Sequence, residues 1–466
     1  MKESRLLVLL SMLLVMFSIS ACGGSSSSSG VASATGTLDS AFNAAGSIPG
    51  IVTHDAAAGA SDWDEGSSVT LASNGKIVVA GFSWNGTNND MAIWRYNTNG
   101  TIDTSFNTVG YVAHDNAAGG TAGHDAGYSV TTDANGKIVV AGFSNNSTNS
   151  DMAIWRYNTN GTLDTSFNTV GFAAHDNAAG GSSSDYGYSV TTDANSKIVV
   201  TGQSNNGTNY DMVIWRYNTN GTLDTSFNSA GYVVHDNAAG GAAGTDAGES
   251  VTIDSNGKIV VTGYSTGTNA DMAIWRYNTD GTLDTSFNST GIVVHSNAAG
   301  GTDGGDYGKS VTTDANGRIV VTGFSTNGTD NDMVVWRYNT DGSLDTSFNT
   351  VGIVAYDDAL GLGSDDDRGR SVTTDANGKI VVAGASYDGS GSIYKVVIWQ
   401  YNTDGTLDTS FDTDGVVTHA GPEGVAGSDD GFNDLTINSG GNIIATGYTD
   451  ASAGGSSGNM LLMKYK

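Results

Sequence analysis

The feature that most constrains this chain is a motif that occurs seven times. Gly-Thr-Leu-Asp-Thr-Ser-Phe, or a close variant, begins at Gly36, Gly100, Gly161, Gly221, Gly281, Gly342 and Gly405. The spacing between successive copies stays within 60 to 64 residues along the 466-residue chain. A fixed period of this kind is the signature of a repeat architecture, in which each unit packs against its neighbours. The sequence therefore predicts seven structural units.

Each unit has the pattern of four short β-strands. In the copy after Gly120 the strands are expected at 128–132, 137–142, 151–157 and 171–175. Asn135-Gly136, between the first two, is typical of a type I′ hairpin with positive φ at both central residues. Helical periodicity is missing beyond the N-terminus, so the fold class is all-β.

The two ends of the repeat region carry complementary parts of one unit. The first copy offers only a fourth strand, at 51–54, whereas the last offers three strands, near 435–437, 442–447 and 460–465. A ring would pair these parts, and an open solenoid would leave free edges. We therefore expect a seven-bladed β-propeller over residues 36–466, with four antiparallel strands per blade, closed by a 3+1 strand exchange between the termini. The period is too long for a WD40 blade of about 40–45 residues or a kelch blade of about 50.

The N-terminus has the pattern of an export signal. Lys2 and Arg5 precede an apolar block at 6–19, which is too short to span a membrane comfortably. Its end, Ile19-Ser20-Ala21-Cys22, resembles the lipobox of bacterial lipoproteins, and Cys22 is the single cysteine of the chain. The resemblance implies a signal peptide at 1–21 and lipidation of Cys22; the alternative is a buried thiol in a signal anchor. Residues 22–35, rich in Gly and Ser, are then a tether.

The same resemblance implies an address. The residue after Cys22 is not Asp, which favours the bacterial outer membrane, facing either the periplasm or the cell surface. Charge bears on the partners, because 48 acidic against 19 basic residues give a net charge of −29. This balance argues against nucleic acid and against membrane contact except through the lipid. We expect a monomeric propeller with a protein or glycan partner.

Two sets of repeated residues are expected to be structural. Six Trp on successive third strands should pack between blades: Trp94, Trp155, Trp215, Trp275, Trp336 and Trp399. Five Arg follow them and should pair with the Asp of each Leu-Asp step, for example Asp224. These are Arg95, Arg156, Arg216, Arg276 and Arg337, with Gln400 and Lys464 at the sixth and seventh positions.

Six histidines share one repeat position, with Tyr356 in the remaining copy. They are His54, His114, His175, His235, His295 and His419. A metal ring is excluded on geometry, because the outermost strand lies roughly 14 Å farther from the axis than the first. We expect structural histidines.

A ring of carboxylates is the candidate ligand site. Seven Asp, each two residues before a Gly, occur where each unit passes to the next inner strand: Asp64, Asp125, Asp185, Asp246, Asp306, Asp367 and Asp429. Near the axis they would repel one another and raise their pKa values. One hypothesis is a face that binds Ca²⁺ or a cationic partner; the other is that each Asp caps its own turn. Loops rich in Asn, Gly, Ser and Thr, such as 145–149 and 325–329, are expected on the same face.

The repeat as a whole resembles the delta-60 repeat of bacterial surface and secreted proteins. The resemblance rests on Asp-x-Gly, Asn-Gly-Lys-Ile-Val-Val-x-Gly, Asp-Met-x-Ile-Trp-Arg-Tyr-Asn and the Gly-Thr-Leu-Asp-Thr-Ser-Phe motif. It implies a propeller and does not imply an activity. Nucleophile-elbow, phosphate-loop, zinc and dinucleotide motifs are missing from the sequence.

Three functions are open at this point. The first is a lipid-anchored, non-enzymatic binding scaffold without a cofactor, since near-identical blades suit multivalent display. The second is an enzyme that acts on envelope or extracellular polysaccharide through the acidic loop face. The third is a structural spacer or coat protein.

Overall fold

The structure is a computed structural model, and it describes residues 33–61, 63–120, 123–181, 183–240, 244–300, 304–361, 366–387, 393–419, 429–450 and 458–466. The signal peptide, Cys22 and most of the tether lie outside these residues. Residues 31–466 form one compact unit. Within the described part of the chain we find no helix that has the length and apolar character needed to cross a membrane.

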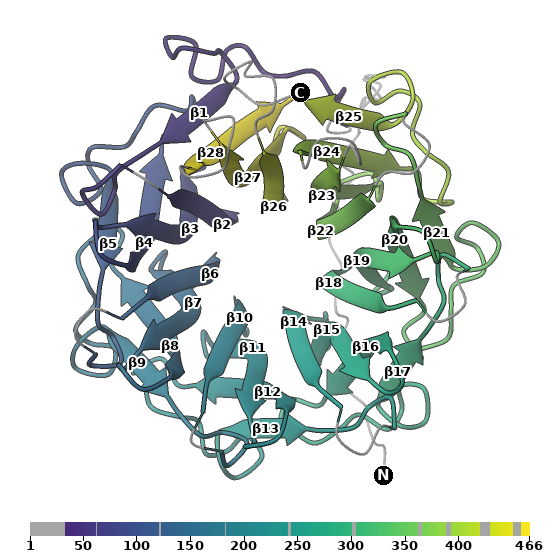
Figure 1. Cartoon of the computed structure of the whole chain (residues 1–466), viewed down its shortest axis with the longest axis horizontal. Helices are drawn as coiled ribbons and strands as arrows, with labels where there is room; N and C mark the ends of the chain where they lie inside the picture. The colour runs from purple at the N-terminus through teal and green to yellow at the C-terminus, as the bar shows by residue number, and fades with distance from the viewer. Residues whose placement is uncertain are drawn as a thin grey trace, which may run out of the picture. The chain divides into compact units, whose positions relative to one another are not determined.

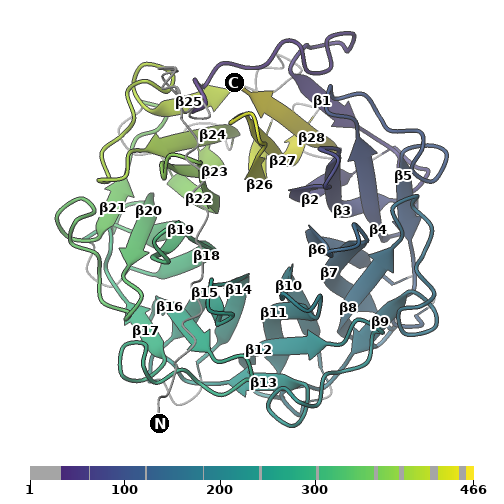
Figure 2. The same ribbon diagram turned by 180° about the vertical axis from the view of Figure 1, so that it is seen from behind.

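The compact unit consists of seven four-stranded antiparallel sheets around a central axis (Figures 1 and 2). The inner strands are β2 (Asp64–Leu71), β6 (Asp125–Thr132), β10 (Asp185–Thr192), β14 (Asp246–Ile253), β18 (Asp306–Thr313), β22 (Asp366–Thr374) and β26 (Asp430–Ile437). The second strands are β3 (Ile77–Trp84), β7 (Ile138–Asn145), β11 (Ile198–Asn205), β15 (Ile259–Thr266), β19 (Ile319–Thr326), β23 (Ile380–Tyr387) and β27 (Ile443–Asp450).

The third strands are β4 (Asn89–Tyr96), β8 (Ser150–Tyr157), β12 (Tyr210–Tyr217), β16 (Ala270–Tyr277), β20 (Asn331–Tyr338), β24 (Tyr394–Tyr401) and β28 (Gly458–Tyr465). The outer strands are β5 (Tyr111–His114), β9 (Phe172–His175), β13 (Tyr232–His235), β17 (Ile292–His295), β21 (Ile353–Tyr356), β25 (Val416–His419) and β1 (Ile51–His54). We number the blades 1 to 7 by their inner strands, from β2 to β26. The seven-bladed, all-β architecture expected from the sequence is confirmed.

Blade 7 closes the ring with strands from both ends of the chain. β1 pairs with β28 in the register Ile51↔Met463 to His54↔Met460, which confirms the 3+1 exchange. The junction extends upstream, because the Asp39 amide donates to the Lys464 carbonyl at 2.7 Å. Ser33, which the sequence placed in the tether, donates to the Asp375 carboxylate at 2.6 Å, and Ala34 is buried in the core.

The core lies between blades because both faces of each sheet are covered by a neighbour. The six Trp of the third strands are all 0% exposed, as expected for core residues. Second strands such as Ile-Val-Val in β7 are buried along their whole apolar run. Burial on both faces explains why these strands are continuously apolar rather than alternating.

The hairpin between the first two strands of a blade differs from the type I′ turn expected. Gly136 has a φ of 74°, but Asn135 does not have a positive φ. The Gly136 amide donates to the Asp133 carbonyl at 2.8 Å, and the Asp133 carboxylate accepts from the amides of Asn135 and Lys137. The loop is thus a three-residue turn that ends in a left-handed glycine, stabilised by the Asp side chain.

Every inner strand contains a β-bulge in its first half. In blade 3 the register passes from Gly187↔Gly202 to Ser189↔Thr201 and leaves Tyr188 without a partner on β11. The same shift occurs in all seven blades. A bulge of this kind redirects one side chain out of the regular pairing.

Candidate functional site

The bulged residues line the central channel. A cavity along the axis is bordered by the bulged residue and the residue after it from every blade. We call the bulged residues the bulge ring: Ser67, Tyr128, Tyr188, Glu249, Lys309, Arg370 and Asn433. Six of the seven blades share most of their sequence, yet this position holds six different residue types. The axis is therefore a place where the otherwise similar strands of the blades differ.

The next residues form a structural ring that joins the blades. We call it the serine ring: Ser68, Ser129, Ser189, Ser250, Ser310, Ser371 and, in blade 7, Asp434. Each of these side chains accepts a hydrogen bond from the backbone of the following blade, as Ser129 Oγ does from the Val190 amide at 3.1 Å. The ring of bonds closes at Asp434, which accepts from the Val69 amide at 2.9 Å.

Asp434 is engaged on both of its carboxylate oxygens. Ser68 and Ser371 donate to it at 2.8 and 2.6 Å, and the amides of Val69 and Leu435 donate at 2.9 and 2.8 Å. Burial raises the pKa of Asp434, and these four hydrogen bonds act in the opposite direction. The residue is a link between blades 6, 7 and 1.

The upper mouth of the channel, where the inner strands begin, holds a charged cavity. Its volume is about 380 Å³, and it is lined by Glu249, Lys309, Phe324, Arg368, Arg370 and Asn433. Lys309 pairs with Glu249 at 2.7 Å and Arg368 with Asp366 at 2.7 Å. Arg370 donates to the Asn433 side-chain carbonyl at 2.7 Å and makes no ion pair with any described residue.

A second network extends from Asn433 to blade 1. The Asn433 amide donates to Glu65 at 2.8 Å, and Trp63 Nε1 donates to the same carboxylate at 3.2 Å. Burial raises the pKa of Glu65, and the Trp63 hydrogen bond, the charge of Arg370 and the Asn433 hydrogen bond counteract this. Arg370, Asn433, Glu65 and Trp63 thus form one connected polar chain across the mouth.

Aromatic rings cover the opposite arc of the mouth. In blades 2 and 3, Tyr128 lies 5.7 Å from Tyr188 and 5.5 Å from Phe143, measured between ring centroids. Tyr186 and Tyr188 are parallel within 3° at 6.1 Å. In blade 5, Tyr307 and Phe324 stack at 4.8 Å beside the charged cavity. These aromatic residues were not predicted as a site, although Tyr128, Tyr188 and their counterparts occupy the visibly variable positions of the repeated pattern Asp-x-Gly-x-Ser-Val.

The aspartate ring occupies a different place from the one expected. Asp64, Asp125, Asp185, Asp246 and Asp306 begin their inner strands, Asp367 is the second residue of β22, and all six are 0% exposed. They accept hydrogen bonds from the backbone of the preceding connection, as Asp125 does from the Asn116 amide at 3.0 Å. None of them is among the residues that line the two channel cavities. This geometry matches the capping role rather than an open cation-binding face.

In the seventh blade the equivalent residue is Asp430 and not Asp429. Asp430 is 0% exposed and pairs with Thr449 in the ladder, as Asp125 pairs with Ser144. Asp429 lies one residue earlier and accepts from the Tyr394 amide at 2.9 Å. The two consecutive aspartates before Gly431 made the sequence register ambiguous, and the phenylalanine at 432 removed the usual glycine.

Burial, rather than repulsion between members of the ring, raises the pKa values of Asp64, Asp125, Asp185 and Asp246. Burial raises the pKa of Asp64, Asp125 and Asp185 to about 6. The additional charge that raises the pKa of Asp125 is that of Asp115, which lies in the connection from β5 to β6 and is not a member of the ring. Calcium binding at these residues remains a prediction from the sequence.

One acidic group in the described residues brings three carboxylates together. Oxygens of Asp330, Asp332 and Asp357 lie within 4.8 Å of one another. The Asn327 amide donates to Asp330 at 2.5 Å and to Asp332 at 2.7 Å, so the group stabilises the loop between β19 and β20. The loops at 387–395 and 449–459 lie mostly outside the described residues.

The arginine clamp has the predicted partners and additional ones. The five Arg Nε atoms lie 2.6 to 2.8 Å from the Asp of the Leu-Asp step, and each guanidinium lies 4.4 to 4.8 Å from the Phe ring of the same motif. Arg156 Nη1 also donates to the Thr219 carbonyl of the next blade at 2.6 Å. In blade 7, Lys464 and Lys466 both reach Asp39 at 3.0 Å across the termini.

The histidines pack between blades. His114 lies edge-on to Trp155 of the following blade at 6.3 Å, and Tyr157 Oη lies 3.4 Å from its Nδ1. Burial lowers the pKa of His114, so the ring is neutral near pH 7. Tyr356 replaces histidine against Trp399 in the same edge-on geometry, at 6.4 Å.

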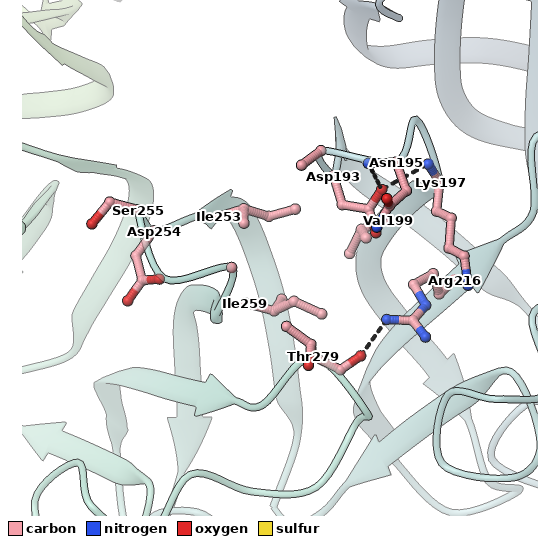
Figure 3. A pocket seen from close by; sticks show the side chains of 12 residues that line it. Asp193, Asn195, Lys197, Val199, Arg216, Ile253, Asp254, Ser255, Ile259 and Thr279 are labelled. Atoms are coloured by element: carbon pink, nitrogen blue, oxygen red, sulfur yellow. Dashed lines mark hydrogen bonds between the residues drawn. The ribbon is translucent and has the colours of Figure 1, made fainter. Parts of the chain in front are cut away.

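A groove of about 390 Å³ lies between blades 3 and 4 on the lower face, where the first hairpins lie (Figure 3). Asp193 there accepts from the amides of Asn195 and Lys197, and Arg216 Nη1 donates to the Thr279 carbonyl. Residues of the same type recur in the other blades, for example Asp133, Lys137 and Arg156 in blade 2. The groove follows from blade packing and does not distinguish one blade from another.

The fold and the channel define a seven-bladed β-propeller with an asymmetric axial site. Comparison with family models finds matches to the "Domain of unknown function (DUF5122) beta-propeller" at residues 72–106, 134–167, 194–227, 255–287, 315–348 and 376–411. These matches support a family of β-propellers of unknown function. A comparison with curated proteins finds no match.

Solved structures share the propeller fold at low identity. A polysaccharide lyase, Uly1, is 11% identical with a TM-score of 0.45, over 86% of this chain and 90% of that chain. A protein of unknown function from Dyadobacter fermentans is 10% identical with a TM-score of 0.39, over 90% and 100%. Sqt1 from Chaetomium thermophilum is 10% identical with a TM-score of 0.41, over 87% and 95%. At these values the likeness carries no argument about activity.

Proposed function

We propose that this protein is a non-enzymatic binding propeller of the bacterial cell envelope, and that its ligand binds at the upper mouth of the channel. The observation that carries the proposal is the bulge ring. Within the inner strands, the bulged side chains differ between blades, border the axial cavity and have no partner in the strand register, so their substitution changes the chemistry of a cavity without changing the scaffold. A protein that served only as a spacer would have no need for different side chains at the bulge ring.

The test compares the native chain with a chain in which the bulge ring is made uniform. Tyr128, Tyr188, Glu249, Lys309, Arg370 and Asn433 are replaced by the serine that blade 1 carries. Both full chains, purified in detergent, are applied to a glycan array and incubated with the glycans that bind. We expect retention by the native chain and loss of retention by the uniform chain. Equal retention would place the site elsewhere, release of shortened glycans would favour the polysaccharide enzyme, and retention of nothing would favour a spacer.

We also propose that Cys22 carries the lipid that anchors the protein to the outer membrane. The support is the sequence pattern before Cys22, which lies outside the described residues. Growth of a Gram-negative host with an alkyne-labelled fatty acid should label the native chain and leave a Cys22→Ala chain unlabelled. Labelling of both chains would contradict the anchor. Protease treatment of whole cells then distinguishes a surface-facing propeller from a periplasmic one.

A further inference from the structure

The charged cavity of the channel mouth is lined by a cation, Arg370, that forms no ion pair with a described residue. In the described part of the chain, every Lys and Arg except Arg370 and Lys395 pairs with a carboxylate. Arg370 is half-buried, donates to the neutral amide of Asn433 at 2.7 Å and lies 5.9 Å from the centroid of the Tyr448 ring. Glu65 and Asp429 feel its charge without forming an ion pair with it. In a chain with a net charge of −29, an unpaired guanidinium is conspicuous. Its remaining N–H groups are suited to a planar carboxylate.

The other cations of the cavity are already paired. Lys309 pairs with Glu249 and Arg368 with Asp366, which leaves Arg370 as the lining cation without an ion pair to a described residue. Low-dielectric walls increase the effect of such a charge on an anion that enters. Arg370 is therefore the group of the cavity that is available to pair with an entering carboxylate.

Flat apolar faces and hydroxyl donors are offered by Phe324 of the charged cavity and by the adjoining axial cavity, which shares Glu249, Lys309, Arg370 and Asn433 with it. Phe324 lines the cavity and stacks on Tyr307, and Tyr128 and Tyr188 border the channel on the opposite arc. Four hydroxyls of the serine ring accept a backbone hydrogen bond but donate to no described group: those of Ser129, Ser189, Ser250 and Ser310. Aromatic faces pack against the C–H surface of a sugar ring, and hydroxyl donors pair with its oxygens.

We infer that the channel mouth binds a saccharide that carries a carboxylate, that is, a uronic acid unit, with the carboxylate on Arg370. The inference rests on the proposed binding function and specifies its ligand class. A cavity of about 380 Å³ is within the size range of small-molecule sites. A neutral saccharide has no carboxylate to pair with Arg370. Its binding would bury the guanidinium without an ion pair, and it is therefore expected to bind more weakly.

The experiment measures binding of matched disaccharides to the full chain in detergent by calorimetry. The probes are the disaccharides of galacturonate, glucuronate and mannuronate, each beside the neutral disaccharide of the same linkage. We expect at least one uronate to bind tenfold or more tightly than its neutral counterpart, on the order of one charge-assisted hydrogen bond. The preference should weaken with added salt.

Variants localise the effect. Arg370→Gln, which retains an amide near Asn433, should remove the preference, and Arg370→Lys should retain part of it. Lys466→Gln changes the net charge equally at the opposite end of β28 and should leave the preference intact. Equal binding of uronates and neutral sugars would overturn the anion inference and leave the binding function standing. Binding of neither, or equal loss in the Lys466→Gln chain, would also overturn the inference, while the uniform-ring comparison tests the binding function independently.

Discussion

Single charged residues join the blades of this acidic molecule. Asp224 lies between Arg216 of β12 and Lys197, the residue before β11. One carboxylate oxygen of Asp224 is 2.6 Å from both Arg216 Nε and Lys197 Nζ, and the residue is 4% exposed. Burial opposes ionisation, but hydrogen bonds from Lys197 and Ser226 and the charge of Arg216 outweigh it and hold the pKa of Asp224 below its usual range. The carboxylate is thus ionised in the fold, and removal of its partners leaves a buried charge.

The first prediction concerns this clamp. Arg216→Ala should destabilise the protein by ~3 kcal/mol or more, because it leaves Asp224 with fewer partners and breaks the bond to Thr279 of blade 4. Thermal melting of the two chains measures the effect. Ligand binding in molecules that remain folded should not change. A melting temperature equal to that of the native chain would contradict the clamp.

The second prediction concerns the aspartate ring and pH. Burial raises the pKa of Asp125 to about 6, above its value in the unfolded chain, so its protonated form favours folding. The stabilisation that protonated Asp125 contributes is fully present below pH ~4, the pKa of Asp in the unfolded chain. Above that pH the unfolded chain loses the proton first, so the stabilisation falls by ~1.4 kcal/mol per pH unit until the pH passes the folded pKa. Asp125→Asn cannot ionise. Its stability relative to the native chain should therefore rise between pH 4 and 6 and level off above pH 7, in denaturant titrations across that range. A difference independent of pH would contradict the raised pKa.

At the level of the strand, the bulge explains both a constant and a variable position. A Cβ added to Gly142 would overlap the carbonyl oxygen of Ala126. The equivalent glycine of every other second strand faces the corresponding carbonyl of its own inner strand in the same way. The bulged residue beside it, Tyr128, projects into the channel and pairs with no strand. Contact with the backbone thus requires glycine at position 142 and its equivalents, whereas the bulged position of Tyr128 can hold different residues in different blades.

The third prediction separates these two positions. Gly142→Ala should lower stability by ~3 kcal/mol, because backbone on both strands must shift. Tyr128→Ser, which introduces the residue of blade 1, should change the melting temperature by much less. Both chains are compared with the native one by thermal melting. A larger effect of Tyr128→Ser than of Gly142→Ala would contradict the account of the bulge.

The strands were predictable because their signals are local. Continuous apolar runs, Gly-containing turns and the Arg-Asp motif recur with a constant period, so strand order and the clamp could be derived without contacts. The turn type was predicted wrongly. The Asp133 carboxylate accepts hydrogen bonds from two backbone amides, and this favours a longer loop than the Asn-Gly pair alone indicates. The channel site was also missed, because inward direction at the bulge depends on register, which the repeat pattern does not specify.

For the molecule as a whole, closure unites the two ends of the chain. β1 covers the edge of β28, Asp39 pairs with Lys464 and Lys466, and the serine ring closes at Asp434 between blades 6, 7 and 1. These contacts join residues more than 360 positions apart, as between Ser68 and Asp434. Without them blade 7 would expose an unpaired strand edge.

The fourth prediction tests closure. A chain that begins at residue 57 lacks β1 and Asp39, and it should melt at a lower temperature and self-associate through the exposed edge of β28. A chain that begins at residue 31 retains both and is the control. Thermal melting and size-exclusion chromatography compare the two. Identical melting and elution would show that the ring does not depend on the N-terminal strand.

The position of the bulge gives the molecule a particular evolutionary freedom. Because the seven bulged side chains take no part in strand pairing, a change of residue there alters recognition while the register and the joints between blades persist. Duplicated repeats of this kind can acquire new specificities one codon at a time, and the same seven codons offer a compact library for redesigning what the propeller binds.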